Sequence, residues 1–251
     1  MYDLEKIKTE FENIDLAIND CKDILIVVHN QYNYVKKCLK SIFENTNNFN
    51  LYIWDNASDK KTKKYLKKIS KNKDNVFLHR SEENLGFIIP NNRMVEKCSS
   101  DFIVLLNSDT EVLKNWDSVL IGFLKKNKDV FLVGYEGGLL NKKGRGVDTC
   151  SGYDADYICG YCMCFSKETY GEFGLFDEEN LEFAYCEDSD FSLRLRNEGK
   201  KIYACYAKDM VFHFGGKTSN AVANEKLSKK IENNMGYLQK RWRKFLSEKK
   251  E

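Results

Sequence analysis

Long apolar runs are missing from this sequence, and their absence narrows the classes of protein it can encode. A membrane-spanning helix needs about 18 or more consecutive apolar residues, and no segment approaches that length. The charged start at residues 1–6 contains none of the apolar core of a secretory signal. The formal net charge is only +2, which gives no indication of a nucleic-acid partner. We therefore expect a cytoplasmic protein that binds no nucleic acid.

The cysteines follow no zinc-finger pattern. There are nine of them, an odd number, and in a chain without an export signal we expect reduced thiols. Cys159, Cys162 and Cys164 are close together, but a second pair of ligands at finger-like spacing is missing. The alternation of residue types over 157–165 predicts a strand there instead.

Apolar periodicity alternates between strand and helix over the first half of the chain. Residues 102–106 form an unbroken apolar run, which is typical of a strand buried on both faces of a parallel sheet. Predicted strands cover 24–28, 51–54, 76–78, 102–106 and 130–133, and predicted helices cover 34–43, 60–69, 91–98 and 116–123. This order predicts a Rossmann-like α/β fold with a mixed, mostly parallel sheet flanked by helices, in a single domain over 23–222.

The rest of the chain is less regular. Residues 134–152 are rich in Gly, Asn and charge, which predicts a loop or an irregular hairpin. Further strands are expected at 157–165, 201–206 and 208–214, and helices near 166 and at 188–197.

Both ends of the chain are expected to be helical, as a leading helix at 1–22 and a basic amphipathic helix at 223–251. Residues 226–251 carry nine Lys or Arg against three Glu, a net +6, which leaves −4 on residues 1–225. The apolar stripe of this helix either packs on the domain or contacts the inner face of a membrane through 226–251. The stripe is needed in both cases, so both interpretations stay open.

Carboxylates mark two candidate sites. Asp109 follows the buried strand 102–106, at the strand end where α/β proteins bind ligands, and a hard carboxylate there suits Mg²⁺ or Mn²⁺. Glu187, Asp188 and Asp190 place three carboxylates in four positions, which raises pKa values and suits a general base. Turn formation and helix capping are the structural alternatives at both places.

Asp190 is expected to pair with Arg194, four residues on, in a structural role. His213 is either a packed histidine or a nitrogen ligand that completes the metal site.

Several motifs occur in an order that resembles family 2 glycosyltransferases of the GT-A fold, over residues 23–218. These are Val28-His29-Asn30, Asp55-Asn56, Asn84-Leu85-Gly86, Asn107-Ser108-Asp109, Asp177-Glu178, Glu187-Asp188 and His213. The segment that begins at Asn84 is similar to the rhamnosyltransferase-like branch.

The resemblance implies an inverting, metal-dependent enzyme. It would move a sugar from a nucleoside diphosphate-sugar, with UDP or dTDP, to a hydroxyl of a glycan or lipid-linked saccharide acceptor. Asp188 would be the catalytic base, and Asp109 and His213 would hold Mn²⁺ or Mg²⁺. The donor would contact Val28, His29, Asn30, Asp55, Asn84, Gly86, Asn107 and Ser108, with Asp55 at the base. Glu187 and Asp177 would position the acceptor or the sugar.

This chain departs from the family pattern at three places. Asn107 occupies the first position of the DxD-type motif, Ser108 stands where this branch often has Pro, and His29 replaces the more usual Tyr. Asn107 favours the alternative of a degenerate module that binds a nucleotide-sugar or glycan without turnover. A nucleotidyltransferase would need a Gly-rich, Arg-bearing loop after the first strand, where this chain has residues 29–32 (HNQY).

Overall fold

The computed structural model describes residues 18–215 and 225–249, together with Thr9 and Ile14. At its centre is a seven-stranded sheet with the order β11-β6-β10-β4-β1-β2-β3. Its strands are β1 (Lys22–Val28), β2 (Phe49–Asn56), β3 (Val76–Ser81), β4 (Phe102–Leu106), β6 (Val130–Gly134), β10 (Cys162–Ser166) and β11 (Lys201–Ala204). β10 is antiparallel to β4 and β6, and the other neighbouring strands are parallel. The predicted mixed, mostly parallel sheet is confirmed.

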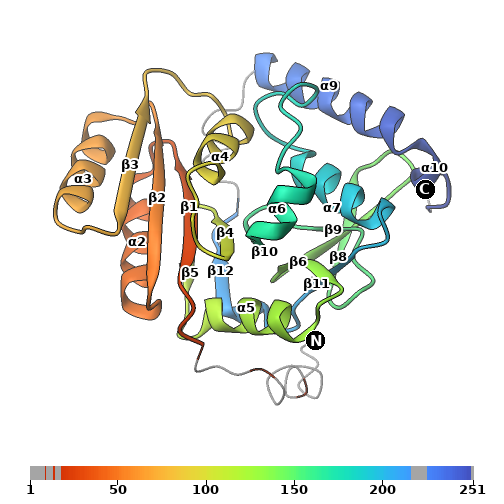
Figure 1. Ribbon diagram of the computed structural model, residues 1–251. Coiled ribbons are helices and arrows are strands. Elements are labelled where there is room, and N and C mark those ends of the chain that lie inside the picture. Colours follow the sequence, from red (N-terminus) through yellow and green to blue (C-terminus); the bar gives the residue numbers. More distant parts are fainter. Residues whose placement is uncertain (1–8, 10–13, 15–17, 216–224, 250–251) are drawn as a thin grey trace.

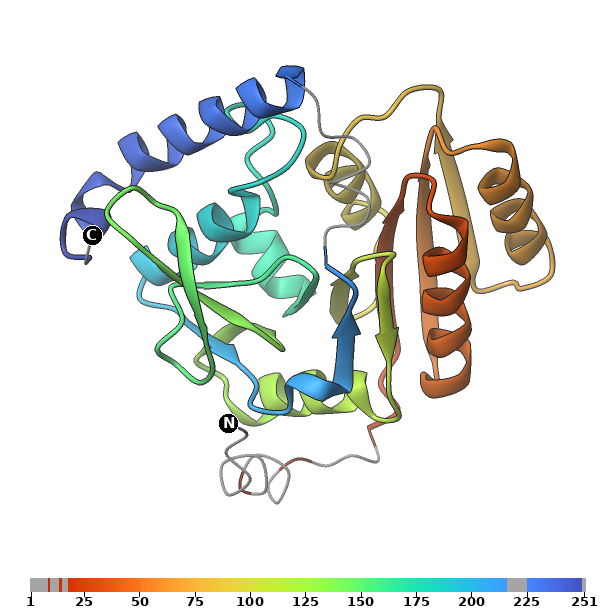
Figure 2. The ribbon, with the colours of Figure 1, turned by 180° about the vertical axis from the view of Figure 1, so that it is seen from behind.

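Helices cover both faces of this sheet (Figures 1 and 2). One face carries α2 (Tyr32–Asn45), α3 (Lys60–Lys71) and α5 (Trp116–Lys126), and the other carries α4 (Ile88–Val95), α6 (Lys167–Phe173) and α7 (Glu187–Asn197). Successive side chains of a strand point to opposite faces. In β1, Ile24 and Ile26 accordingly belong to one core, and Leu25 belongs to the other.

Several predicted elements differ from the structure. The helix expected at 91–98 begins three residues earlier, at Ile88, because Pro90 is tolerated in a first helical turn. The strand expected at 157–165 is divided into β9 (Tyr157–Ile158) and β10. The strand expected at 208–214 is shortened to β12 (Val211–His213), after a 3-10 turn at Lys208–Met210.

The hairpin interpretation of 134–152 is confirmed. β7 (Gly137–Leu140) pairs antiparallel with β8 (Gly146–Cys150), and β7 also pairs with β9 in a separate three-stranded sheet. A two-stranded sheet joins β5 (Thr110–Val112) to β12.

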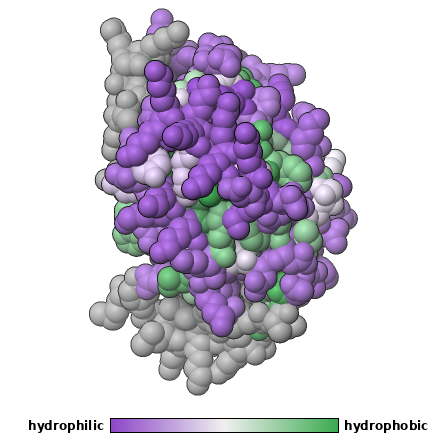
Figure 3. Space-filling model, turned by 90° about the vertical axis from the view of Figure 1, so that its left-hand side faces the viewer, coloured by the Kyte–Doolittle hydropathy of each residue, from purple (hydrophilic) through white to green (hydrophobic). Residues whose placement is uncertain are grey.

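Near the C-terminus, α9 (Glu225–Arg241) lies across α7, and α10 (Arg243–Ser247) follows after a break at Trp242 (Figure 1). Leu238 of α9 is fully buried in the core that contains α7. At the other end of the molecule, the face beside α3 and β3 is mostly hydrophilic (Figure 3). The leading helix predicted at 1–22 falls mostly outside the described residues, and its predicted end is wrong, because 18–21 form no helix and β1 begins at Lys22. None of the described helices is long and apolar enough to cross a membrane.

Candidate functional site

A cavity of about 880 Å³ lies where β1, β2 and β4 end. Parallel strands of α/β proteins bind ligands at their carboxyl ends, and ligand pockets typically measure about 300–1,000 Å³. Nine of the residues predicted from sequence line this cavity: His29, Asn84, Gly86, Asn107, Ser108, Asp109, Glu187, Asp188 and His213. Four others are outside its lining: Val28, Asn30, Asp55 and Asp177. The fold therefore brings most of the predicted residues together from distant parts of the chain.

Asp109 and His213 are neighbours in the wall of this cavity. The pairing of β5 with β12 places His213 opposite Thr110, the residue after Asp109. The His213 Nε2 atom is 3.2 Å from Asp109 Oδ1, in a geometry that makes no hydrogen bond. The imidazole ring stacks on Tyr161, with ring centroids 4.6 Å apart and planes at 14°. Stacking restricts rotation of the ring and keeps Nε2 beside the carboxylate.

These two side chains fit a divalent cation. A carboxylate oxygen suits Mn²⁺ or Mg²⁺, an imidazole nitrogen is a common metal ligand, and the buried Nε2 atom has no hydrogen-bond partner among the described residues. The described part of the chain contains no group of three or more His, Cys, Asp or Glu side chains that could hold a metal ion by themselves. The remaining ligands would come from water and substrate phosphate, as is common for Mg²⁺.

Asp188 is held by backbone amides in the first turn of α7. Its Oδ2 atom accepts a hydrogen bond of 3.0 Å from the Gly160 amide, and Oδ1 accepts one of 2.7 Å from the Ser189 amide. The preceding Cys186 has φ 72°, in the left-handed region, which turns the chain sharply into the helix. This turn directs the start of α7 at the cavity.

Burial raises the pKa of both carboxyl groups at the start of α7. The pKa of Glu187 rises to about 8, because the group is buried and because the Asp188 charge is adjacent. Burial also raises the pKa of Asp188, while hydrogen bonds from Gly160 and Ser189 act in the opposite direction. Two adjacent carboxyl groups of this kind titrate as a pair, so near neutral pH the site can hold one protonated and one ionised carboxyl group.

Beside the end of β2, Asp55 is already paired. Its Oδ2 atom forms an ion pair with Arg80 of β3, and Oδ1 accepts a hydrogen bond of 2.9 Å from the Ser58 amide. The Asp55 side chain is only 1% exposed. Asn30 holds the same turn, because its Oδ1 accepts a hydrogen bond of 2.7 Å from the Asp59 amide. Asp55 and Asn30 thus shape the turn beside the cavity.

Asn56 contacts two residues, Asn84 and Gly86, that the sequence predicted to bind the donor. Its Nδ2 atom donates hydrogen bonds of 2.7 Å to Asn84 Oδ1 and to the Gly86 carbonyl. Gly86 has φ +82°, and a Cβ atom there would be 2.3 Å from the Phe183 carbonyl oxygen. The loop at 84–87 therefore packs directly on the segment that leads to Glu187, and only glycine permits this approach.

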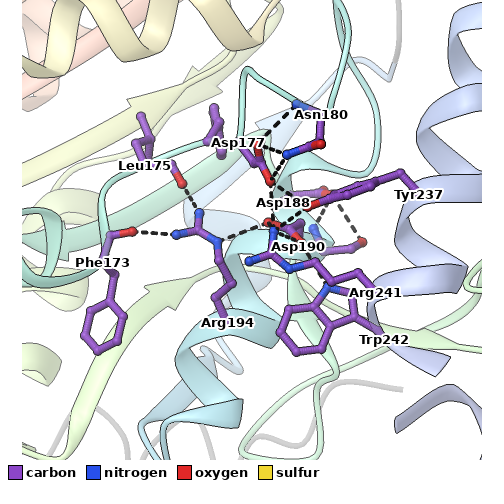
Figure 4. Close-up of polar contacts among 12 residues, drawn as sticks. Phe173, Leu175, Asp177, Asn180, Asp188, Asp190, Arg194, Tyr237, Arg241 and Trp242 are labelled. Atoms are coloured by element: carbon purple, nitrogen blue, oxygen red, sulfur yellow. Dashed lines mark hydrogen bonds and ion pairs between the residues drawn. The ribbon is translucent and has the colours of Figure 1, made fainter. Parts of the chain in front are cut away.

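Behind the cavity, Asp177 and Asp190 anchor α9 (Figure 4). Asp190 accepts a hydrogen bond of 3.0 Å from Arg194 Nε and one of 2.9 Å from Trp242 Nε1, so its predicted pairing with Arg194 is confirmed. Asp177 accepts hydrogen bonds of 2.7 Å from the Tyr237 hydroxyl and 2.8 Å from Arg241 Nη1. Both carboxylates connect the body of the domain to the C-terminal helix.

Sequence reasoning missed several residues of the cavity wall, among them Glu136, Arg145 and Tyr161. Glu136 and Arg145 lie in the irregular region around the β7–β8 hairpin, where no periodic pattern indicates which side chains face a site. Arg145 is the sole Lys or Arg among the described lining residues. Five lining residues carry a carboxyl group: Asp109, Glu136, Glu187, Asp188 and Glu232.

Comparisons with known proteins agree with this architecture. Among solved structures, GalNAc-T7 with UDP, GalNAc and Mn²⁺ matches at 16% identity and a TM-score of 0.66, over 76% of this chain and 43% of that one. The mannosyltransferase PcManGT from Pyrobaculum calidifontis, with GDP-Man and Mn²⁺, matches at 12% identity and a TM-score of 0.60, over 80% and 60%. S. aureus TarS with UDP-GlcNAc matches at 18% identity and a TM-score of 0.59, over 74% and 56%.

The chain thus spans about half the length of the solved structures that it matches. At these identities the likeness establishes a shared GT-A fold. No curated protein matches the sequence. The family model for glycosyl transferase family 2 matches residues 23–165, which include β1, β2 and β4 and the residues at their carboxyl ends. The chain therefore belongs to glycosyl transferase family 2.

Proposed function

We propose that this chain is an inverting, metal-dependent glycosyltransferase that takes a sugar from a nucleoside diphosphate-sugar. The observation that carries the proposal is that Asp109, His213 and Asp188 line one cavity in a member of this family. The nucleotides and Mn²⁺ in the similar structures support the same chemistry. We assign the acceptor as a hydroxyl of a glycan or lipid-linked saccharide.

On the donor side, Asp109 and His213 would hold Mn²⁺ or Mg²⁺ against the diphosphate, where the cation would stabilise the charge of the leaving group. His29, Asn84, Gly86, Asn107 and Ser108 line the same cavity and would contact the donor. Resemblance to the rhamnosyltransferase-like branch favours UDP or dTDP. An imide N–H of uracil or thymine could donate to Asp55 only after Arg80 moves, because Arg80 is paired with this buried carboxylate.

In the transfer itself, the acceptor oxygen attacks the anomeric carbon while the bond from that carbon to the diphosphate oxygen breaks. Asp188 takes the proton of the acceptor hydroxyl, and its two backbone hydrogen bonds keep the carboxylate in place. Glu187 has a raised pKa, so it can remain protonated near neutral pH and donate a hydrogen bond to a substrate oxygen. Attack opposite the leaving group inverts the anomeric configuration, as in inverting glycosidases.

A panel of UDP-, dTDP- and GDP-sugars with Mn²⁺ tests this function, scored by release of the nucleoside diphosphate and repeated with EDTA. We expect release from one uridine or thymidine donor and loss of that release with EDTA. Release that is indifferent to EDTA would contradict the metal assignment. Thermal stabilisation by a nucleotide-sugar without any release would favour the binding module that Asn107 suggests.

A further inference from the structure

A second hollow, of about 770 Å³, lies between the tip of the β7–β8 hairpin and the junction of α9 with α10. Its lining consists of Lys142, Lys143, Gly236, Gln239, Lys240, Arg243, Leu246 and Ser247. Four of these eight residues are Lys or Arg, and none is acidic. We refer to this hollow as the basic groove.

Within the described residues, no carboxylate forms an ion pair with the four cations of the basic groove. Arg241 lies between Lys240 and Arg243 in the sequence but differs from both, because it forms ion pairs with Asp177 and Asp190. Like charges gathered without counter-charges repel one another, and a bound anion relieves that repulsion. The arrangement therefore favours an anionic ligand.

The tip of the hairpin is held in place against the C-terminal helices. Gln239 Nε2 donates a hydrogen bond of 2.8 Å to the Lys143 carbonyl. Gly144 has φ +66°, and a Cβ atom there would be 3.2 Å from Leu238 and 3.4 Å from Leu246. Lys142 and Lys143 therefore extend from a fixed backbone, which reduces the entropy lost when they bind a ligand.

The basic groove is continuous with the main cavity, because Gly236 and Gln239 line both. Arg145, two residues after Lys143, lines the main cavity and extends the positive charge into it. Asp109 and His213, which we assign to the donor diphosphate, are not part of the groove lining. The groove thus joins the cavity that Asp188 lines through residues other than those assigned to the donor diphosphate.

We propose that the basic groove binds a phosphate group of the acceptor, a diphosphate or phosphodiester attached to the sugar whose hydroxyl reaches Asp188. This inference rests on the proposed function, since it concerns the acceptor of the same site. Lys and Arg clusters bind phosphate through charge-assisted hydrogen bonds. A neutral glycan would gain nothing from four unpaired cations.

Calorimetric titration without any donor tests the groove with three probes. These are a farnesyl-diphosphate-linked N-acetylglucosamine, a glycerol-phosphate hexamer, and the phosphate-free octyl N-acetylglucosaminide. The variants are Lys142→Gln/Lys143→Gln and Lys240→Gln/Arg243→Gln. The matched control is Lys64→Gln/Lys67→Gln, which removes two exposed lysines from α3 at the far end of the molecule. Thermal melting of each variant verifies that it is folded.

We expect one phosphate probe to bind at least tenfold more tightly than the phosphate-free probe, and each groove variant to lose at least fivefold in that affinity. The control should bind as the unaltered chain does. Preference for the farnesyl probe would identify a lipid-linked acceptor, and preference for the hexamer a phosphodiester polymer. Equal binding of charged and neutral probes, or groove variants that bind normally, would overturn the proposal.

The experiments test phosphate binding by the groove and glycosyl transfer separately, so each proposal can be refuted without the other. The titrations contain no donor, whereas nucleotide release by the unaltered chain is measured without an acceptor. A chain that binds a phosphate probe but releases no nucleotide, either alone or with that probe added as acceptor, would refute the transferase and retain the anion site. Release without phosphate binding would refute the groove alone.

Discussion

At the scale of single residues, the proposed chemistry of the cavity depends on two adjacent carboxyl groups with different surroundings. Asp188 receives two backbone hydrogen bonds, which favour its ionised form. Glu187 Oε2 is buried without a hydrogen-bond partner among the described residues, which favours the neutral form. The two groups are therefore suited to opposite tasks, one to accept a proton and the other to retain one.

Replacement of Asp188 by Asn should lower turnover by about 10²–10⁴-fold, because the amide cannot accept the acceptor proton. Donor affinity should change little, since Asp188 is held by Gly160 and Ser189 and is separate from the assigned metal ligands. Initial rates and a nucleotide titration measure the two effects. Asp154→Asn, at an exposed position, is the matched control. An Asp188→Asn variant with full turnover would remove the residue from this role.

Replacement of Glu187 by Gln should stabilise the fold more at high pH than at low pH. The pKa of Glu187 is about 8 in the folded chain, against an ordinary 4.5, so ionisation costs stability progressively as pH rises from about 4.5 to 8. The Gln side chain does not ionise, so the variant does not lose this stability as pH rises. Its advantage should grow by at least about 1.4 kcal/mol, the equivalent of one pKa unit, between pH 5 and 9. Urea unfolding with EDTA measures it, and an advantage independent of pH would contradict the assignment.

At the scale of elements, α9 fixes the segment that precedes Glu187 and Asp188. Asn234 is fully buried, and its amide group accepts a hydrogen bond from the Glu182 amide and donates to the carbonyls of Glu182, Ala184 and Tyr185, all at 2.8–3.0 Å. The adjacent Phe183, Tyr185 and Cys186 all have positive φ values. Such a backbone is strained, so the helix is needed to hold it.

Asn234→Ala should therefore destabilise the protein by about 2 kcal/mol, because several backbone groups lose their buried partner. It should also lower turnover, since the segment that leads to Asp188 is released. Chemical unfolding and initial rates measure both effects. Asn233→Ala, at the neighbouring exposed position, should change neither. Equal stability of the two variants would show that α9 does not hold this segment.

Local patterns explain how much of the fold and site could be predicted. Apolar periodicity located the strands and helices around the sheet, and the abrupt end of β4 indicated Asp109. Contacts between distant segments produce no such pattern in the sequence. The pairing of Asp55 with Arg80 and the approach of Gly86 to Phe183 depend on strand order and loop path. The hydrogen bond that Asp177 accepts from Tyr237 likewise depends on where α9 packs.

At the scale of the whole molecule, the C-terminal helix is part of the domain core rather than an appendage. Leu238 is fully buried in the same cluster as Phe191 of α7 and Leu105 of β4. Trp242, which lies in the segment 226–251 that could contact a membrane, donates its indole N–H to Asp190. The membrane interpretation of 226–251 would therefore have to rely on the cations at its surface.

Leu238→Ala should cost about 3 kcal/mol, because it leaves a cavity in a shared core. Unfolding should remain a single calorimetric transition, since the cluster extends from α9 into the sheet. Lys240→Ala, at an exposed position on the same helix, is the control and should leave the transition almost unchanged. A separate early transition in the Leu238→Ala variant would show that α9 unfolds independently.

Two adjacent rows of side chains on α9 also set a limit on redesign. Asn234 and Leu238 are buried, while Ile231, Met235 and Gln239 line the cavity. A mutant library intended to change the proposed acceptor specificity could vary Ile231, and it would have to leave untouched the buried Asn234 and Leu238 and also Gln239, which holds the hairpin tip. Randomising the whole helix would mostly yield unfolded chains, and selection would then report folding instead of specificity.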